Sequence, residues 1–409
     1  MDAAVRDRPT PELSGGRRYP ALTGMRALAA TAVVLTHSAF STGSYGDTPL
    51  GRLWQRLDLG VAVFFVLSGF LLARPFLLAA RNGRPAPRTS AYLWRRALRV
   101  LPLYWATVVL AFLLLPSNHS AGPGEWLRHL FLLQNYTEGG SIAEGLFHTW
   151  SLSTEVAFYL VLPLGAAVLL RICGPGFRPA RLLAALGGLT VVSTVWWCTV
   201  AGERDLGRPD IWLPGFLGWF AAGAALGVLS VADARWRPVQ LATQLGDSLG
   251  TCWALAGALF WITCSSLAGP IDLSPASPAE AATKNLLHLG TATLLVLPLV
   301  FGDQRRGAVR AVLTSAPLQH LGRTSYGLFL LHMPLLLAGT AALSFQPTSV
   351  DLWWVALGTW TSAVLLAEVG HRLLEIPAER LRHLVPDRRP REAGTSPATT
   401  AATAPSAST

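Results

Sequence analysis

Apolar segments of about the length that crosses a bilayer recur along the whole of this chain. Because about 20 consecutive apolar residues span the hydrocarbon core of a membrane, each such segment predicts a membrane-spanning helix. A chain with this pattern cannot fold as a soluble domain, and 51% of its 409 residues are hydrophobic while only 14% are charged. We predict an all-α integral membrane protein with about ten transmembrane helices, at residues 22–40, 59–80, 101–115, 150–170, 181–201, 211–231, 249–268, 285–301, 325–343 and 352–374.

The distribution of charged residues predicts how these helices are oriented. Arginines accumulate in the connections at 81–99, 171–181 and 305–323, which all lie on the same side as the N-terminus if every segment crosses the membrane. The connections at 117–149 and 202–210 are acidic or balanced. Since basic loops stay on the cytoplasmic side, we expect both termini to be cytoplasmic. The net charge of +10 then follows from topology, and a nucleic-acid-binding protein is not indicated.

The polar ends of the chain suggest a simple domain organisation. We predict a basic cytoplasmic tail at 1–19, a membrane domain at 20–384, and a disordered tail at 385–409 that is rich in Ser, Thr, Ala and Pro. The four cysteines have no metal-ligand spacing, so we predict no metal site and no bound cofactor. The chain has one lysine against 32 arginines, which suggests a GC-rich bacterial genome and a bacterial cytoplasmic membrane.

Two ionisable residues, Arg26 and His37, interrupt the first apolar segment. Eleven residues correspond to about three helical turns, so both side chains leave the same helix face, about 16 Å apart along the axis. Ionisable groups inside spanning helices are costly, and they tend to face a protein interior or a wet cavity. We therefore predict that this face is functional, although an arginine can also reach the interface and a histidine can simply bond to a loop.

Six short blocks of distinctive sequence follow one another along the chain. In the first, an arginine and a histidine are separated by ten residues, and in the second, GVAVFFVLSGF, two phenylalanines are followed closely by Ser-Gly. The third is a basic segment, and the last is a closing Glu-Ile-Pro. The six blocks occupy residues 20–37, 60–70, 95–104, 150–159, 325–332 and 375–377. Together, and in this order, they resemble the membrane acyltransferase family 3.

This resemblance implies an acyltransferase for groups other than aminoacyl groups, which moves an acyl group, usually acetyl, from cytoplasmic acyl-CoA to a hydroxyl. A hydroxyl needs a base to remove its proton as it attacks a thioester, and we expect His37 to be that base. A carboxylate on the other imidazole nitrogen would fix its tautomer. We predict that Glu155, expected at the same depth, is that partner, with a structural ion pair or a wetted helix start as the alternative.

Further residues of these blocks are candidates for a donor site. Guanidinium groups bind the phosphates of coenzyme A well, although basic residues beside a membrane can serve topology alone. Ser68 suits close helix packing better than nucleophilic catalysis, and His332 is either channel lining or a core histidine. The predicted donor-binding and channel residues are Arg26, Arg95, Arg96, Arg99, Phe64, Phe65, Ser68, Tyr159 and His332.

The acceptor remains open at this level. A cell-envelope glycan or glycolipid is the first expectation, which would make the reaction a carbohydrate O-acetylation. A macrolide-like natural product is the second. A polytopic transporter or flippase without enzymatic activity is the alternative class, although no internal repeat supports it. The expected partners are acyl-CoA, the hydroxyl acceptor and the lipid bilayer, with direct transfer or a separate partner protein both possible.

Overall fold

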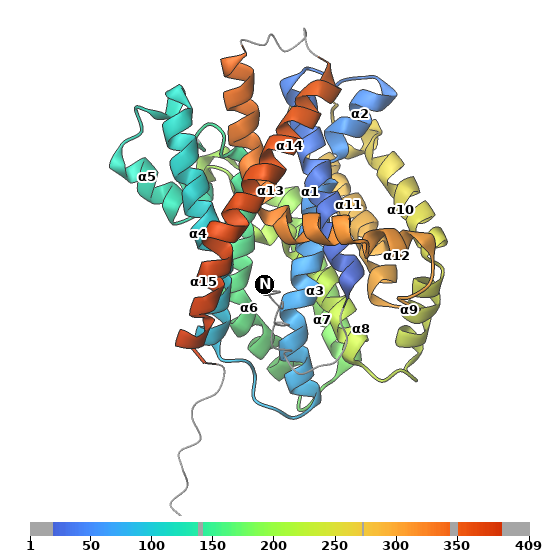
Figure 1. Ribbon diagram of the computed structural model, residues 1–409. Helices are drawn as coiled ribbons and strands as arrows, with labels where there is room; N and C mark the ends of the chain where they lie inside the picture. The colour runs from blue at the N-terminus through green and yellow to red at the C-terminus, as the bar shows by residue number, and fades with distance from the viewer. Residues whose placement is uncertain (1–18, 138–141, 272–273, 344–350, 387–409) are drawn as a thin grey trace, which may run out of the picture.

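The computed structural model describes residues 19–137, 142–271, 274–343 and 351–386, and throughout these ranges the regular structure is helical. The two predicted tails lie, apart from a few residues, outside the described part of the chain. The fifteen α-helices are α1 Pro20–Ser41, α2 Pro49–Arg56, α3 Leu59–Arg81, α4 Thr89–Leu114, α5 Pro123–Leu130, α6 Trp150–Ile172, α7 Pro179–Thr199, α8 Leu217–Val231, α9 Arg237–Asp247, α10 Leu249–Thr263, α11 Pro278–Val300, α12 Ala308–Leu313, α13 Ala316–Ala342, α14 Leu352–Gly370 and α15 Ile376–Arg380 (Figure 1).

Each of the ten predicted segments falls on a helix, but fewer than ten helices qualify as membrane spans. In the described residues, eight are long and apolar enough, and a ninth results if α9 and α10, bent by 87°, form one broken span. Helix α1 is not among the eight, because Thr23, Arg26 and His37 dilute its apolar character. The protein is therefore an all-helical, multi-pass membrane protein with eight or nine candidate spans, while the orientation of its termini stays a prediction.

Helix α4 is longer than predicted. The sequence suggested a short span at 101–115 preceded by a basic connection, whereas α4 is a 26-residue helix that begins at Thr89. No glycine or proline interrupts residues 89–101, and Ala91, Tyr92 and Leu98 are buried on one side, so the helix continues through the basic segment. The arginines at 95–99 are thus held on a helix and do not lie in a loop.

The centre of the bundle is α1, which packs against α3, α13 and α14 (Figure 1). Gly24, Ala27, Ala29 and Ala30 of α1 are buried, and such small residues let helices approach closely in a membrane. By contrast, α6 and α7 expose many apolar side chains, which is what helices that face lipid require. The polar face of α1 is therefore enclosed by protein.

The pair α3 and α8 makes the closest helix contact around this centre. A Cβ placed on Gly223 of α8 would lie 1.9 Å from the carbonyl oxygen of Val66, and one placed on Gly69 of α3 would lie 2.1 Å from that of Phe220. Neither distance leaves room for a methyl group. Glycine at both positions therefore fixes how near α3, with its site residues, lies to the rest of the bundle.

We predict that Gly223→Ala destabilises the protein, because the new methyl group would push α8 away from α3. Overpacking of this kind typically costs about 1–3 kcal/mol. The matched control is Gly257→Ala in α10, where nothing lies within 4 Å of the added carbon. Thermal unfolding midpoints of the purified proteins check this: the midpoint should fall for Gly223→Ala alone, and equal midpoints for both variants would contradict the packing argument.

Candidate active site

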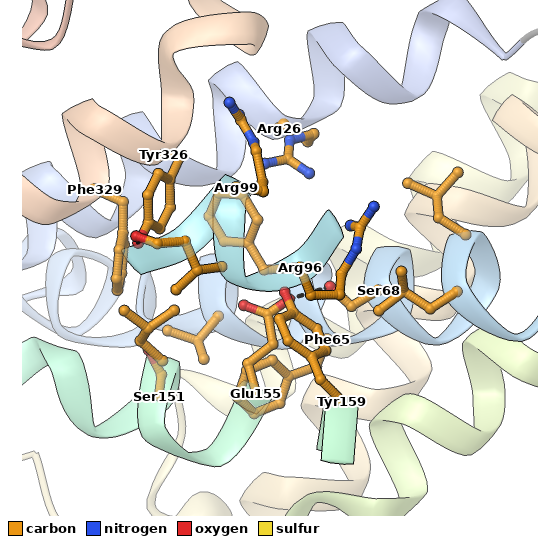
Figure 2. Close-up of a pocket in the computed structure, with 16 residues that line it drawn as sticks. Arg26, Phe65, Ser68, Arg96, Arg99, Ser151, Glu155, Tyr159, Tyr326 and Phe329 are labelled. Atoms are coloured by element: carbon orange, nitrogen blue, oxygen red, sulfur yellow. Dashed lines mark hydrogen bonds between the residues drawn. The ribbon is translucent and has the colours of Figure 1, made fainter. Parts of the chain in front are cut away.

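Two cavities lie along the polar face of α1. The first, here called the Arg26 cavity, has a volume of about 100 Å³. Figure 2 shows the side chains that converge on it from α1, α3, α4, α6 and α13. Eight of the eleven predicted site residues line it: Arg26, Phe64, Phe65, Ser68, Arg96, Arg99, Glu155 and Tyr159.

The Arg26 cavity is positively charged. Three guanidinium groups, those of Arg26, Arg96 and Arg99, line it against one carboxylate, Glu155. The guanidinium of Arg26 lies 5.7 Å from the ring centre of Phe64, within cation–π range. Its Nε donates to Ser325 Oγ at 3.4 Å. The buried Nε of Arg96 has no hydrogen-bond partner among the described residues, so the cavity can accept an anionic group.

Arg99 is held in place from the far end of the chain. It forms an ion pair with Glu375, whose side chain is 1% exposed, and its Nη2 donates to the carbonyl oxygen of Arg323 at 3.3 Å. Its guanidinium also lies 5.7 Å from the ring centre of Tyr326. Glu375 ends a short π-helix, His371–Glu375, between α14 and α15; such turns are frequent at functional sites.

Glu155 does not contact His37. Its carboxylate accepts a hydrogen bond from the hydroxyl of Ser68, in the Arg26 cavity. The two residues were expected at one depth because α6 starts at Trp150 near the level of His37. Trp150 does line the cavity of His37, but one helical turn carries Glu155 past it, to the arginines. The predicted pairing of Glu155 with the imidazole is therefore replaced by a pairing with Ser68.

The second cavity, here called the His37 cavity, has a volume of about 190 Å³. His37 lines it together with His148, Asp58, Lys284 and Trp150. Lys284 Nζ lies 2.6 Å from Asp58 Oδ2, so an ion pair joins α11 to the start of α3 in its wall. This cavity therefore combines polar groups with aromatic surface, as small-molecule sites commonly do.

His332, which the sequence placed in a channel or in the core, is a direct neighbour of His37. The Nε2 atom of His332 lies 3.0 Å from the Nδ1 atom of His37, and His332 is fully buried. The last predicted donor residue, Arg95, lines neither cavity. It lies on α4 next to Arg96, one position round the helix from the cavity-facing side.

His148 is a site residue that the sequence reasoning missed. Its ring is 6.4 Å from that of His37 and 4.8 Å from that of His332, centre to centre. Its Nε2 donates to the carbonyl oxygen of Leu330 at 3.1 Å. Pro334 has no N–H, so it leaves that carbonyl without its helical partner. Two features of the sequence could have identified His148 as a site residue. It lies two residues before the block at 150–159, and its partner carbonyl is left free by Pro334, a proline inside an apolar helix.

The two cavities are separated by a thin layer of side chains. Val61 of α3 and Phe329 of α13 are the residues that line both. The ring of Phe329 also lies 6.1 Å from that of Phe64 in one cavity and 5.1 Å from that of His148 in the other. Arg26 and His37 thus mark two compartments that meet at a thin apolar wall.

No group of three or more His, Cys, Asp or Glu side chains in the described residues is arranged to hold a metal ion. The site therefore consists of cationic, imidazole, hydroxyl and carboxylate groups. Such groups can bind an anionic ligand at one end, and at the other an unprotonated imidazole nitrogen can accept a proton from a ligand.

Sequence comparisons connect this arrangement to known proteins. The chain is 27% identical to acyltransferase MdmB of Streptomyces mycarofaciens, over 93% of this chain and 96% of that protein. It is 26% identical to nodulation protein 10 of Rhizobium leguminosarum bv. viciae, over 93% and 98% respectively. It is 24% identical to peptidoglycan O-acetyltransferase OatA of Listeria monocytogenes over 89% of this chain, but it spans only 56% of that relative.

No solved structure matches the chain. The family model described as an acyltransferase domain, however, matches residues 19–368, which hold both cavities and every site residue described above except Glu375. The chain therefore belongs to acyltransferase family 3, a family of integral-membrane acyltransferases.

Proposed function

We propose that this enzyme moves an acetyl group from cytoplasmic acetyl-CoA to a hydroxyl of a cell-envelope glycan or glycolipid. In this proposal the donor enters the Arg26 cavity, the acceptor enters the His37 cavity, and His37 is the general base. The observation that carries it is the meeting of a cationic cavity and a cavity lined by His37 and His148 at one thin wall.

The Arg26 cavity suits a coenzyme A thioester. The phosphates of coenzyme A need cations, and Arg96 offers a buried Nε that has no partner in the described part of the chain, while Arg99 is fixed by Glu375. A pantetheine arm stretched like a peptide reaches on the order of 15–20 Å. Arg26 and His37 are about 16 Å apart along α1, so an arm anchored among the arginines can bring its thioester to the wall.

The reaction itself needs one base and one leaving group. The acceptor oxygen attacks the thioester carbonyl while His37 takes the hydroxyl proton. The carbon–sulfur bond then breaks, an ester is formed, and coenzyme A leaves with its sulfur as a thiolate that receives the proton back from the imidazolium. Glu155 balances part of the charge of the arginines and orients Ser68 beside the donor arm, which gives it a positioning role.

The composition of the His37 cavity supports a sugar acceptor. Asp58 offers hydrogen-bond acceptors and Lys284 offers hydrogen-bond donors to sugar hydroxyls. Trp150 and Phe147 offer aromatic surface against which the apolar face of a sugar ring can pack. A cavity of about 150 Å³ holds benzene, so this slightly larger one has room for one six-membered ring. The relative OatA is named for peptidoglycan O-acetylation. A macrolide-like natural product is the second candidate, and the experiment below separates the two.

We predict that His37→Ala abolishes acyl transfer. Membranes that contain the protein should release free thiol when they are supplied with acetyl-CoA and a cell-envelope extract. His37→Ala should reduce the rate of thiol release by about 100-fold or more, because this is the typical contribution of a general base. His119→Ala, an exposed histidine that lines neither cavity, is the matched control and should keep full activity.

Mass spectrometry of the host strain identifies the acceptor. A deletion strain complemented with His37→Ala should lack one ester-sized mass increment that the wild-type strain carries. The increment is expected in an envelope glycan or glycolipid; its loss from a secreted metabolite would instead select the natural-product function. If every acyl ester persists in the His37→Ala strain, the proposal is wrong.

We also predict that Arg96→Gln weakens donor binding. The loss of one charge-assisted contact, worth about 1.5–3 kcal/mol, should raise the KM for acetyl-CoA about tenfold or more, with a much smaller effect on kcat. Arg84→Gln is the control, because Arg84 is exposed in the same basic stretch but lines neither cavity. If the KM for acetyl-CoA rises equally in both variants, Arg96 does not bind the donor specifically, and the basic residues serve only to orient the protein in the membrane.

A further inference from the structure

Both ring nitrogens of His332 are engaged in the middle of α13. Its Nδ1 lies 2.6 Å from the backbone carbonyl oxygen of Phe329, one turn earlier in the same helix. Its Nε2 lies 3.0 Å from Nδ1 of His37 on α1. The side chain is fully buried, so its protons must be distributed between these two partners.

These contacts fix where the protons lie. A carbonyl oxygen can only accept, so Nδ1 of His332 must carry a proton and donate it to Phe329. A neutral imidazole has one N–H, which leaves Nε2 of His332 as an acceptor. The hydrogen bond between the rings then requires that Nδ1 of His37 is the donor. Consequently Nε2 of His37 carries no proton and is free to take one.

The alternative distribution would need a positive charge on His332. A doubly protonated His332 would donate to Nδ1 of His37 and force the proton of His37 onto Nε2. Burying such a cation is costly unless a carboxylate pairs with it. No carboxylate forms an ion pair with His332 among the described residues, and the rings packed on it are those of Phe329, His37 and His148.

The other ionisable groups near His37 do not change this assignment. His148 donates its Nε2 proton to Leu330, so this proton is not shared with His332. Asp58 and Lys284, which line the His37 cavity, pair with each other at 2.6 Å, and His288 lies 3.8 Å from Asp58 on the same side. The bond from His332 is thus the one side-chain hydrogen bond that the described residues make to the imidazole of His37, whose ring also lies against the backbone carbonyl of Val33, one turn earlier in α1.

We infer that His332 is a positioning residue that holds His37 in the tautomer with its proton on Nδ1 and its Nε2 bare for the acceptor hydroxyl. It takes the place that a carboxylate takes in hydrolase triads, but as a neutral acceptor, and it is itself fixed by a backbone carbonyl. This inference rests on the proposed function of His37 as the base. It assigns to His332 the orienting role that the sequence assigned to Glu155.

Two substitutions of His332 test whether the hydrogen-bond acceptor at the position of Nε2 is what matters. His332→Gln can bring its amide oxygen close to the position of Nε2 and still accept from His37, whereas His332→Leu fills a similar volume without any acceptor. Nitrogen-15 NMR of histidine-labelled protein in nanodiscs reports the tautomer, and the signal of His37 is identified by its loss in His37→Ala. Thermal unfolding shows whether each variant folds.

We expect the Nδ1–H tautomer for His37 in the wild-type protein and in His332→Gln, and a shift towards Nε2–H or a mixture in His332→Leu. In thiol-release assays, His332→Leu should lower kcat by about 100-fold or more with little change in the KM for acetyl-CoA, and His332→Gln should recover most of that loss. An Nε2–H tautomer in the wild-type protein would overturn the inference even if neither variant folds.

The role of His37 as the base and the role of His332 as its positioning residue can be disproved independently. If His37→Ala remains active while the wild-type tautomer is Nδ1–H, the pairing stands but His37 is not the base. If His37→Ala is inactive while His332→Leu matches the wild type in kcat and in its pH profile, His37 is the base and His332 does not position it.

Discussion

The cost of placing ionisable side chains among apolar helices determines how the centre of this protein is built. Arg26 and His37 could not face lipid without a large penalty, so the helix that carries them is surrounded by α3, α13 and α14. The same requirement draws other polar groups to this axis: the arginines of α4, Glu155 of α6 and the buried His332 of α13. Each cavity exists because these groups need protein or ligand partners that hydrocarbon cannot supply.

Helix positions could be predicted from the sequence because they depend on local information, whereas most residues of the Arg26 cavity were identified through the six blocks that resemble the family. Apolar length predicts a helix, and a spacing of three, four, seven or eleven residues places side chains on one face. Phe64 and Ser68, four residues apart on α3, line the Arg26 cavity together in this way. Eight or nine helices of the described residues qualify as candidate spans by length and apolar character, and α1 is not among them, because a helix buried at the centre of a bundle need not be as apolar as one that faces lipid.

Contacts between helices could not be predicted in the same way. The depth of Glu155 depends on where α6 begins relative to α1: Trp150 lines the His37 cavity, whereas Glu155, five residues later, bonds to Ser68 in the Arg26 cavity. The neighbour of His37 comes from almost 300 residues away along the chain, and its own orientation depends on the carbonyl of Phe329. Such pairings arise from packing geometry, which no periodicity in the sequence contains.

The thin wall between the cavities gives the proposed reaction its order. An acyl thioester that waits among the arginines is separated from the polar His37 cavity by Val61 and Phe329, so water there has no direct path to it. Transfer requires these apolar side chains to move aside, and an acceptor that fills the His37 cavity displaces the water that would otherwise compete for the acyl group. A base held by a neutral histidine suits this arrangement, because His332 adds no permanent charge beside His37.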